Sequence, residues 1–238
     1  MTERLDKIVA DTENCTRSQA RTLIRRGEVA VGGQTVRDIA RKTDPASEEI
    51  SVSGRILAAG RCYIMMNKPV GVISATESAG ERTVLDLLPP RLKRRGLFPA
   101  GRLDKDTTGF MLITDDGPFA HEILSPRRHV EKEYEALLEH PANAADIEAF
   151  ACGIRLGDGT ECAPAVLELD DARTTARIVI REGKYHQVRR MFEAVGNRVA
   201  ALRRLRIGGL YLDDTLAPGA ARLMTPEEVS QIRRGSIP

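Results

Sequence analysis

Residues 101–109 read Gly-Arg-Leu-Asp-Lys-Asp-Thr-Thr-Gly, and they lead directly into an apolar run at 110–114, Phe-Met-Leu-Ile-Thr. The first segment predicts a polar loop bracketed by glycines, and the second predicts a buried β-strand. Loops on rigid scaffolds carry much catalytic function. Asp104, beside Arg102 at the mouth of this strand, is therefore the first candidate for a catalytic residue.

The loop by itself allows three interpretations. Asp104 and Asp106 form an Asp-x-Asp pair followed by threonine, as in phosphatases of the haloacid dehalogenase type, but a proline and a glycine precede the pair and argue against the central strand that such a site needs. A metal site needs further carboxylates, and Asp115-Asp116 fits the turn after the strand better. The third interpretation is an Asx-turn with Arg102 as a surface ion-pair partner. The loop alone leaves the structural and catalytic interpretations open.

The order of the expected elements indicates an α+β fold. Strands are expected at 63–67, 110–114, 133–138, 165–169 and 175–181, and helices at 117–124, 143–152, 185–195 and 226–233. This order is neither a regular βαβ alternation nor an all-β pattern, so we expect a mixed, mainly antiparallel sheet flanked by helices.

The composition is that of a globular protein. Of the 238 residues, 42% are apolar and 29% are charged, and no apolar run approaches the roughly 18 to 20 residues of a membrane span. The N-terminus has no signal-peptide core. The four cysteines have neither a Cys-x-x-Cys pair nor a metal-ligand spacing, so reduced thiols in a cytosol are the simplest interpretation. We therefore expect a cytoplasmic protein without membrane association or a bound metal.

Residues 1–60 are expected to form a separate small domain, with a linker at 57–60. A helix at 4–12 is followed by a second helix at 17–26, which Thr16 caps and Gly27 ends. A hairpin at 29–36 and a strand at 49–52 come next. Three arginines spaced four apart lie on one face of the second helix, and a fourth follows them: Arg17, Arg21, Arg25 and Arg26.

This segment resembles the alpha-L RNA-binding domain found in a small-subunit ribosomal protein and in tyrosyl-tRNA synthetases. The matching stretches are 4–7, 16–20, 23–29 and 31–33. In that family the second helix and the turn after it contact RNA phosphates. The resemblance therefore implies phosphate contacts for Arg17, Arg21, Arg25 and Arg26.

Basic residues also gather at 91–105 and 181–206, although the net charge is only +2. Three such clusters on one chain favour a nucleic-acid partner. Within 183–192, a histidine at a helix start is more often structural than catalytic, whereas Arg189 is able to neutralise a partly buried carboxylate. Tyr134 either packs in the core or stacks on an unstacked base.

In combination, these motifs resemble bacterial pseudouridine synthases of the ribosomal small-subunit family. The matching stretches are 67–71 (Asn-Lys-Pro-Val-Gly), 101–109, 131–134, 183–192, 196–197 and 206–210. The resemblance covers nearly the whole chain. It implies a catalytic domain at 61–238 and the isomerisation of one uridine in ribosomal RNA to pseudouridine, without a cofactor.

The same resemblance implies roles for individual residues. The family's catalytic aspartate corresponds to Asp104, its tyrosine in Lys-x-Tyr to Tyr134, and its basic residue in His-Gln-x-(Arg or Lys) to Arg189. In this hypothesis Arg102 helps to extrude or replace the base, Tyr134 stacks on it, Arg189 keeps Asp104 ionised and Asp106 stabilises the loop. An ordinary phosphate contact is the open alternative for Arg102. Further substrate contacts are expected from Lys184, His186, Gln187 and Arg190.

The stretches at 131–134, 164–168 and 216–219 look more like the small-subunit (16S) enzyme than its large-subunit relatives. The expected partner is therefore 16S ribosomal RNA or a ribosomal-subunit assembly intermediate, bound by a monomer. Two alternatives stay open, which are a 23S ribosomal RNA pseudouridine synthase and a non-catalytic RNA-binding factor in ribosome assembly.

Overall fold

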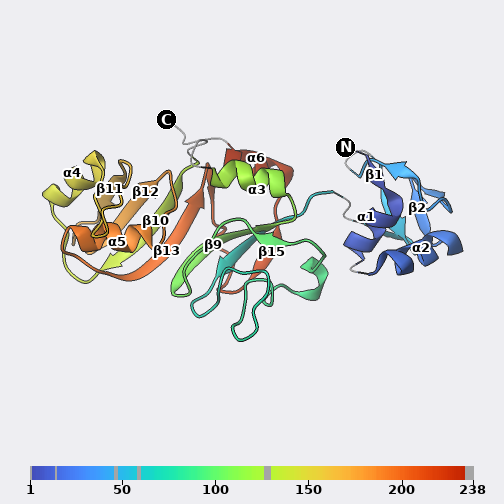
Figure 1. Cartoon of the computed structure of the whole chain (residues 1–238), viewed down its shortest axis with the longest axis horizontal. Helices are drawn as coiled ribbons and strands as arrows, with labels where there is room; N and C mark the ends of the chain where they lie inside the picture. The colour runs from blue at the N-terminus through green and yellow to red at the C-terminus, as the bar shows by residue number, and fades with distance from the viewer. Residues whose placement is uncertain (1, 14, 46–47, 58–59, 126–129, 234–238) are drawn as a thin grey trace. The chain divides into compact units, whose positions relative to one another are not determined.

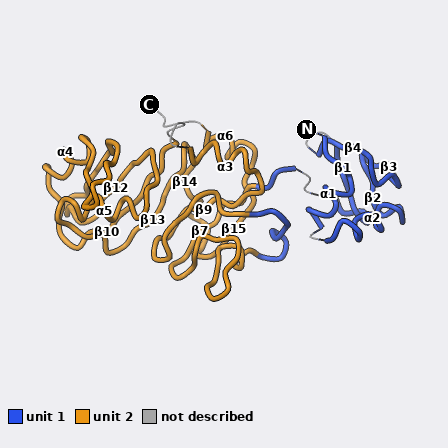
Figure 2. The backbone as a smooth tube through the Cα atoms, in the orientation of Figure 1, with its two compact units in different colours: residues 1–62, 89–97 blue, residues 63–88, 98–238 orange. Residues whose placement is uncertain are grey.

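The computed structural model describes residues 2–13, 15–45, 48–57, 60–125 and 130–233 (Figure 1). It contains two compact units, which are Met1–Cys62 with Pro89–Leu97, and Tyr63–Leu88 with Phe98–Pro238 (Figure 2). Residues 58 and 59 of the expected linker lie outside the described residues.

The first unit packs two helices on small antiparallel sheets. Helix α1 (Leu5–Thr12) starts one residue later than expected because Arg4 is extended and belongs to a short strand. Helix α2 (Arg17–Arg26) has the bounds that its sequence predicts. Thr16 and Gln19 form a capping box at its start, and Gly27, with a φ of 77°, ends it. The helices cover an aliphatic core that includes Leu5, Val9 and Ile24.

The strands of the first unit are short. A four-stranded sheet has the order β3-β2-β5-β6, and β1 pairs with β4 in a separate two-stranded sheet. Their bounds are β1 Glu3–Arg4, β2 Val29–Val31, β3 Gln34–Thr35, β4 Lys42–Thr43, β5 Ile50–Val52 and β6 Arg55–Ile56, and a 3-10 turn spans Pro90–Leu92. The resulting arrangement of two helices and a small sheet is the one that the resemblance to an RNA-binding domain implies.

The second unit is built on a nine-stranded sheet with the order β11-β12-β10-β13-β9-β7-β15, in which β14 also pairs with β13 and β8 with β9. Among the described residues, each pairing in this sheet is antiparallel except that of β9 with β13. The structure thus confirms the predicted α+β fold with a mixed, mainly antiparallel sheet. The strands are β7 Tyr63–Lys68, β8 Phe98–Pro99, β9 Thr107–Thr114, β10 Lys132–Leu138, β11 Val166–Leu169, β12 Thr175–Ile180, β13 Val199–Ile207, β14 Leu210–Tyr211 and β15 Ala221–Leu223.

Two pairs of helices pack on different parts of this sheet (Figure 1). Helices α3 (Gly117–Leu124) and α6 (Pro226–Arg233) pack on a core with β9 and β14, whereas α4 (Ala144–Cys152) lies beside β11. Helix α5 (Gln187–Ala194) joins α4 through Phe192, whose ring centroid is 4.9 Å from that of Phe150. Every helix in the described part of the chain is too short or too polar to cross a lipid bilayer.

Strand β13 was not predicted, although it lies near the middle of the sheet. Its segment looked only like a basic cluster, but Arg204 and Arg206 are 3% and 8% exposed. The Arg204 Nε atom donates to the Phe110 carbonyl at 2.8 Å, and the Arg206 Nε atom donates to Glu133 at 2.7 Å. Buried charges need such partners. Because these partners come from distant segments, the local hydropathy of the charged segment did not predict a buried strand.

Candidate active site

The loop that carries Asp104 is fixed from one side by residues 71–74. The Ser74 hydroxyl donates to the Leu103 carbonyl at 2.8 Å, and the Leu103 amide is 2.9 Å from the same hydroxyl oxygen. The Gly71 amide donates to the Lys105 carbonyl at 2.8 Å. Hydrogen bonds to the backbone of Leu103 and of Lys105 therefore hold the residue on each side of Asp104.

Lys68, the last residue of β7, also holds this loop, through hydrogen bonds from its side chain. Its side chain is fully buried, and its Nζ atom donates to the carbonyls of Thr107, Asp104, Pro69 and Lys105 at 2.8, 3.0, 3.2 and 3.3 Å. Burial lowers the pKa of Lys68 to about 8, although the charges of Asp106 and Asp104 oppose the shift. Lys68 lies in the stretch 67–71 that matches the family, but no role was predicted for it. A lysine at the end of an apolar strand was the available signal.

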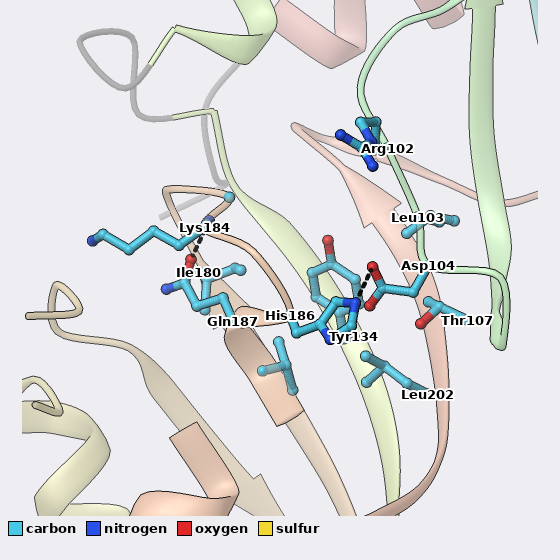
Figure 3. Close-up of a pocket in the computed structure, with 12 residues that line it drawn as sticks. Arg102, Leu103, Asp104, Thr107, Tyr134, Ile180, Lys184, His186, Gln187 and Leu202 are labelled. Carbon is cyan, nitrogen blue, oxygen red and sulfur yellow. Dashed lines mark hydrogen bonds and ion pairs between the residues drawn. The ribbon is translucent and has the colours of Figure 1, made fainter. Parts of the chain in front are cut away.

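Asp104 points into a pocket where β9, β10 and the start of α5 come together (Figure 3). Its carboxylate oxygen Oδ1 lies 3.4 Å from the Nε2 atom of His186, and 30% of its side chain is exposed. The Tyr134 ring, 7% exposed, forms part of the wall beside them. The pocket is lined by Arg102, Leu103, Asp104, Thr107, Tyr134, Ile180, Gly183, Lys184, His186, Gln187, Val188 and Leu202.

His186 reaches Asp104 through an unusual backbone conformation. It precedes α5 with φ 48° and ψ 34°, a left-handed conformation that is uncommon for residues other than glycine. The turn before it is held by Gln187, whose side chain accepts from the Lys184 amide at 2.9 Å and donates to Glu182 at 2.6 Å. These contacts hold the turn that places the imidazole at the carboxylate, and α5 is shorter than the predicted 185–195.

Arg189 is a correction to the sequence analysis, because its carboxylate partner is Asp106 rather than Asp104. Its Nη1 atom donates to the Val199 carbonyl at 2.9 Å, and its Nη2 atom lies 2.9 Å from Asp106 Oδ2. The contact with Val199 holds the guanidinium where it meets Asp106, while the turn before α5 directs His186 to Asp104. The Arg189–Asp106 pair ties the loop to α5.

The other predicted contacts are divided between the pocket and its surroundings. Arg102 lies at the rim, away from the contact between Asp104 and His186 (Figure 3). Lys184 forms an ion pair with Glu182, and Arg190 pairs with Asp158 at 2.5 Å. The pocket therefore brings together Asp104, Tyr134, Arg102, Lys184, His186 and Gln187, whereas Arg189 and Arg190 are not among its lining residues.

In the first unit, Arg17 and Arg21 have a structural partner that the sequence analysis did not anticipate. Asp6 is fully buried, and it accepts hydrogen bonds from Arg17 and Arg21 at 2.9 Å and from Arg4 at 3.1 Å. Burial alone raises the pKa of Asp6, but the bonds from the three arginines outweigh burial and hold the pKa well below its usual range.

The arginines of α2 nevertheless stay accessible. The side chains of Arg17 and Arg21 are 49% and 40% exposed. Arg25 and Arg26 are exposed, and Arg26 lies 4.0 Å from Glu28. The described surface of α2 therefore presents four guanidinium groups, two of which are oriented by Asp6.

Comparison with known proteins found matching family models and relatives that are similar over nearly the full length of the chain. Residues 62–194 match the family model for RNA pseudouridylate synthase, and residues 3–48 match that for the S4 domain. The chain is 44% identical over 232 residues to the ribosomal small subunit pseudouridine synthase A of Escherichia coli (strain K12), covering 96% of this chain and 99% of the relative. It is 43% identical over 230 residues to the uncharacterized RNA pseudouridine synthase YtzG of Bacillus subtilis (strain 168), covering 95% and 96%.

Among solved structures, a crystal structure of pseudouridylate synthase matches with a TM-score of 0.68 and 38% identity, covering 96% of this chain and 99% of that chain. The family model spans more than half of the chain, and the relatives are similar over nearly its full length. The chain therefore belongs to the RNA pseudouridylate synthase family and carries an S4 domain at its N-terminal end.

Proposed function

We propose that this RNA pseudouridine synthase isomerises a uridine of 16S ribosomal RNA and that Asp104 is its catalytic carboxylate. The observation that carries the proposal is the position of Asp104, partly exposed in a pocket beside Tyr134 and His186, on a loop that buried Lys68 holds in place. The small-subunit substrate is supported by the Escherichia coli relative, whose name states that activity.

The reaction breaks the bond between C1′ of the ribose and N1 of uracil and then joins C1′ to C5. A proton leaves C5 and N1 gains one, so the product is an isomer and no electrons are transferred. Positive charge develops at C1′ when the first bond breaks, and a carboxylate is suited to stabilise that charge, to attack C1′ or to take the 2′ proton and give a glycal intermediate; attack on C6 of the base is a fourth route. One oxygen of Asp104 faces His186, and the partial exposure of the carboxylate leaves it accessible to the ribose.

The target uridine must leave its stack before its C1′ atom can reach Asp104, which costs a few kcal/mol. Tyr134 offers an aromatic ring beside the carboxylate on which the flipped uracil stacks. Arg102, at the rim of the pocket, fills the space that the base leaves in the RNA. Arg189 acts indirectly, since it pairs with Asp106 and so fixes the loop on which Asp104 lies.

The S4 domain is proposed to hold flanking RNA through the phosphates. Arg17, Arg21, Arg25 and Arg26 lie on one helix and keep their side chains accessible, so the domain offers a row of cations. Residues 1–60 would then serve as the RNA-holding domain and residues 61–238 as the catalytic one. We further propose that the enzyme acts as a monomer in the cytoplasm, on ribosomal RNA or on an assembly intermediate.

Asp104→Asn tests the catalytic assignment because it keeps the shape of the side chain and removes its charge. Pseudouridine formation on 16S fragments is measured by carbodiimide labelling and primer extension. Removing one group that stabilises the charge of a transition state typically costs about 10²- to 10³-fold in rate, and we expect a loss at least that large. Asp106→Asn is the comparison variant: it weakens the pair with Arg189 that fixes the loop, and it should therefore lower the activity, but by less than Asp104→Asn does.

An Asp104→Asn enzyme of unchanged activity would overturn the assignment, and inactivity confined to Asp106→Asn would move it to Asp106. The RNA target is tested separately, by mapping pseudouridines in ribosomal RNA from cells with and without the protein. A site lost only from 23S RNA would replace the small-subunit proposal with the large-subunit alternative. An unchanged map would favour the non-catalytic alternative.

A further inference from the structure

Tyr185 presents an aromatic ring to solvent next to the catalytic pocket. The residue is 71% exposed, and its ring stacks on His186 with centroids 3.8 Å apart and an angle of 18° between the planes. His186 in turn lies 3.4 Å from Asp104. His186 thus contacts both the exposed tyrosine and the carboxylate, and this tyrosine has no role in the proposed mechanism.

The backbone conformation of His186 brings the two rings together. In an extended chain, successive side chains point to opposite sides, whereas the left-handed conformation of His186 places its ring parallel to that of its neighbour. Such a conformation is strained and persists where surrounding contacts enforce it, often at functional sites. Here Gln187 holds the turn, and Arg190 donates to the Tyr185 carbonyl at 3.3 Å.

A ring held in this way is prepared for stacking. One face of Tyr185 is covered by His186, which limits the orientations of the ring, and its exposure leaves the other face open. Stacking on a ring that is already oriented avoids part of the entropy cost of ordering a side chain. Every nucleobase has a flat face, so a ring of this kind accepts a base with little regard to its identity.

We infer that the open face of Tyr185 stacks on an unpaired nucleobase of the RNA adjacent to the target uridine. The target uracil is assigned to Tyr134 instead, because Tyr134 lines the pocket that holds Asp104, whereas Tyr185 is not among the lining residues of that pocket. The adjacent base is thereby held while the uridine turns into the pocket. This inference rests on the proposed function, since it takes Asp104 to be the group that the target ribose must reach.

The test is a double-mutant cycle between Tyr185 and the neighbouring bases. RNA binding is measured for the full chain carrying Asp104→Asn, so that the RNA is not converted, with Tyr185 intact or replaced by Ala, Leu or Phe. The RNAs are a 16S fragment that the wild-type enzyme converts and two versions of it with an abasic ribose immediately 5′ or 3′ of the target.

Tyr185→Ala should weaken binding of the intact RNA by about 5- to 150-fold, the range typical of one stacked base. One of the two abasic RNAs should bind the Tyr185-containing protein more weakly by a similar factor, while Tyr185→Ala should bind that RNA no more weakly than the intact one. Tyr185→Phe should retain tight binding because it keeps the ring, whereas Tyr185→Leu should lose it.

Fully additive effects at both neighbouring positions would overturn the inference, as would a Tyr185→Phe protein that binds as weakly as Tyr185→Ala. Coupling to an abasic ribose at the target position instead would show that Tyr185 holds the target uracil, which also contradicts the inference. Failure of the proposed function is recognised separately. In that case Asp104→Asn still forms pseudouridine, whatever the binding cycle shows.

Discussion

Asp6 and Asp104 are both aspartates with arginines nearby in the sequence, but the two units surround them differently. Asp6 is fully buried and accepts hydrogen bonds from three arginines. Asp104 is 30% exposed, and the ionisable side chain in contact with its carboxylate among the described residues is that of His186, at 3.4 Å. The nearby Arg189 is directed to Asp106. A buried carboxylate whose two oxygens accept hydrogen bonds from arginines orients those arginines, whereas a carboxylate that stays partly exposed is available to a substrate.

This comparison predicts that the same substitution, aspartate to asparagine, changes the stability of the two units by very different amounts. Asp6→Asn should destabilise the first unit by about 3 kcal/mol, because removing one partner of a buried ion pair costs about 3–5 kcal/mol and the arginines here remain partly solvated. Asp104→Asn should change the stability of the second unit by less than about 0.5 kcal/mol, as expected for a partly exposed group. Hydrogen exchange of the amides in α1 and α2, and in β9 and β10, measures the two effects separately.

A loss of protection in β9 and β10 of Asp104→Asn, similar to that in α1 and α2 of Asp6→Asn, would contradict the comparison. In that case Asp104 would have a structural role, and its effect on activity would no longer identify it as catalytic.

Two buried lysines of the second unit allow a similar comparison, between a residue that holds the catalytic loop and one that does not. Burial lowers the pKa of both Lys68 and Lys132 to about 8, but Lys68 holds the catalytic loop, whereas Lys132 donates to the carbonyl of Val130 at 3.1 Å. Lys68→Met should reduce the rate of pseudouridine formation by about 10- to 100-fold, because a shift of about 1 Å in a reacting group costs up to about 10²-fold. Single-turnover kinetics with saturating enzyme measures this rate.

Lys132→Met is the matched control, since it makes the same change at a lysine that is buried to a similar degree. It should change the rate by less than about threefold, a difference of well under 1 kcal/mol in activation free energy. Equal losses of rate in the two variants would show that the removal of buried charge, and not the fixing of the loop, accounts for the effect of Lys68.

The elements that were predicted best are those with local signals. The bounds of α2 follow from Thr16, Gln19 and Gly27, which all lie at its ends. Strand β13 was missed because its buried arginines find their partners only after folding: Arg204 donates to the carbonyl of Phe110, 94 positions away, and Arg206 donates to Glu133, 73 positions away. The periodicity of apolar residues in the sequence predicts which face of an element is buried, but it does not predict which charged side chains find a partner after folding.

The same limit applies to the site. The resemblance directed attention to Asp104 and Tyr134, and the structure brings both into one pocket. It did not indicate that Arg189 would meet Asp106, because that choice depends on the Val199 carbonyl, which is ten positions away. The role of Lys68 depends on carbonyls that lie up to 39 positions away. Motifs identify residue types, and the contacts made after folding decide which atoms they face.

The last expected effect is the pH dependence that Asp6 gives to the first unit. Because the pKa of Asp6 is lower in the folded protein than in the unfolded chain, the unfolded chain binds the proton more readily in the range between the two values. The stabilisation from Asp6 is therefore fully present above about pH 5 and is lost progressively as the pH falls toward the folded pKa. Hydrogen exchange in α1 and α2, corrected for the intrinsic exchange rate at each pH, should show this loss in the wild type and a weaker one in Asp6→Asn. An equal acid dependence in both proteins would assign the effect to other carboxylates and would remove Asp6 as the group that organises the arginines.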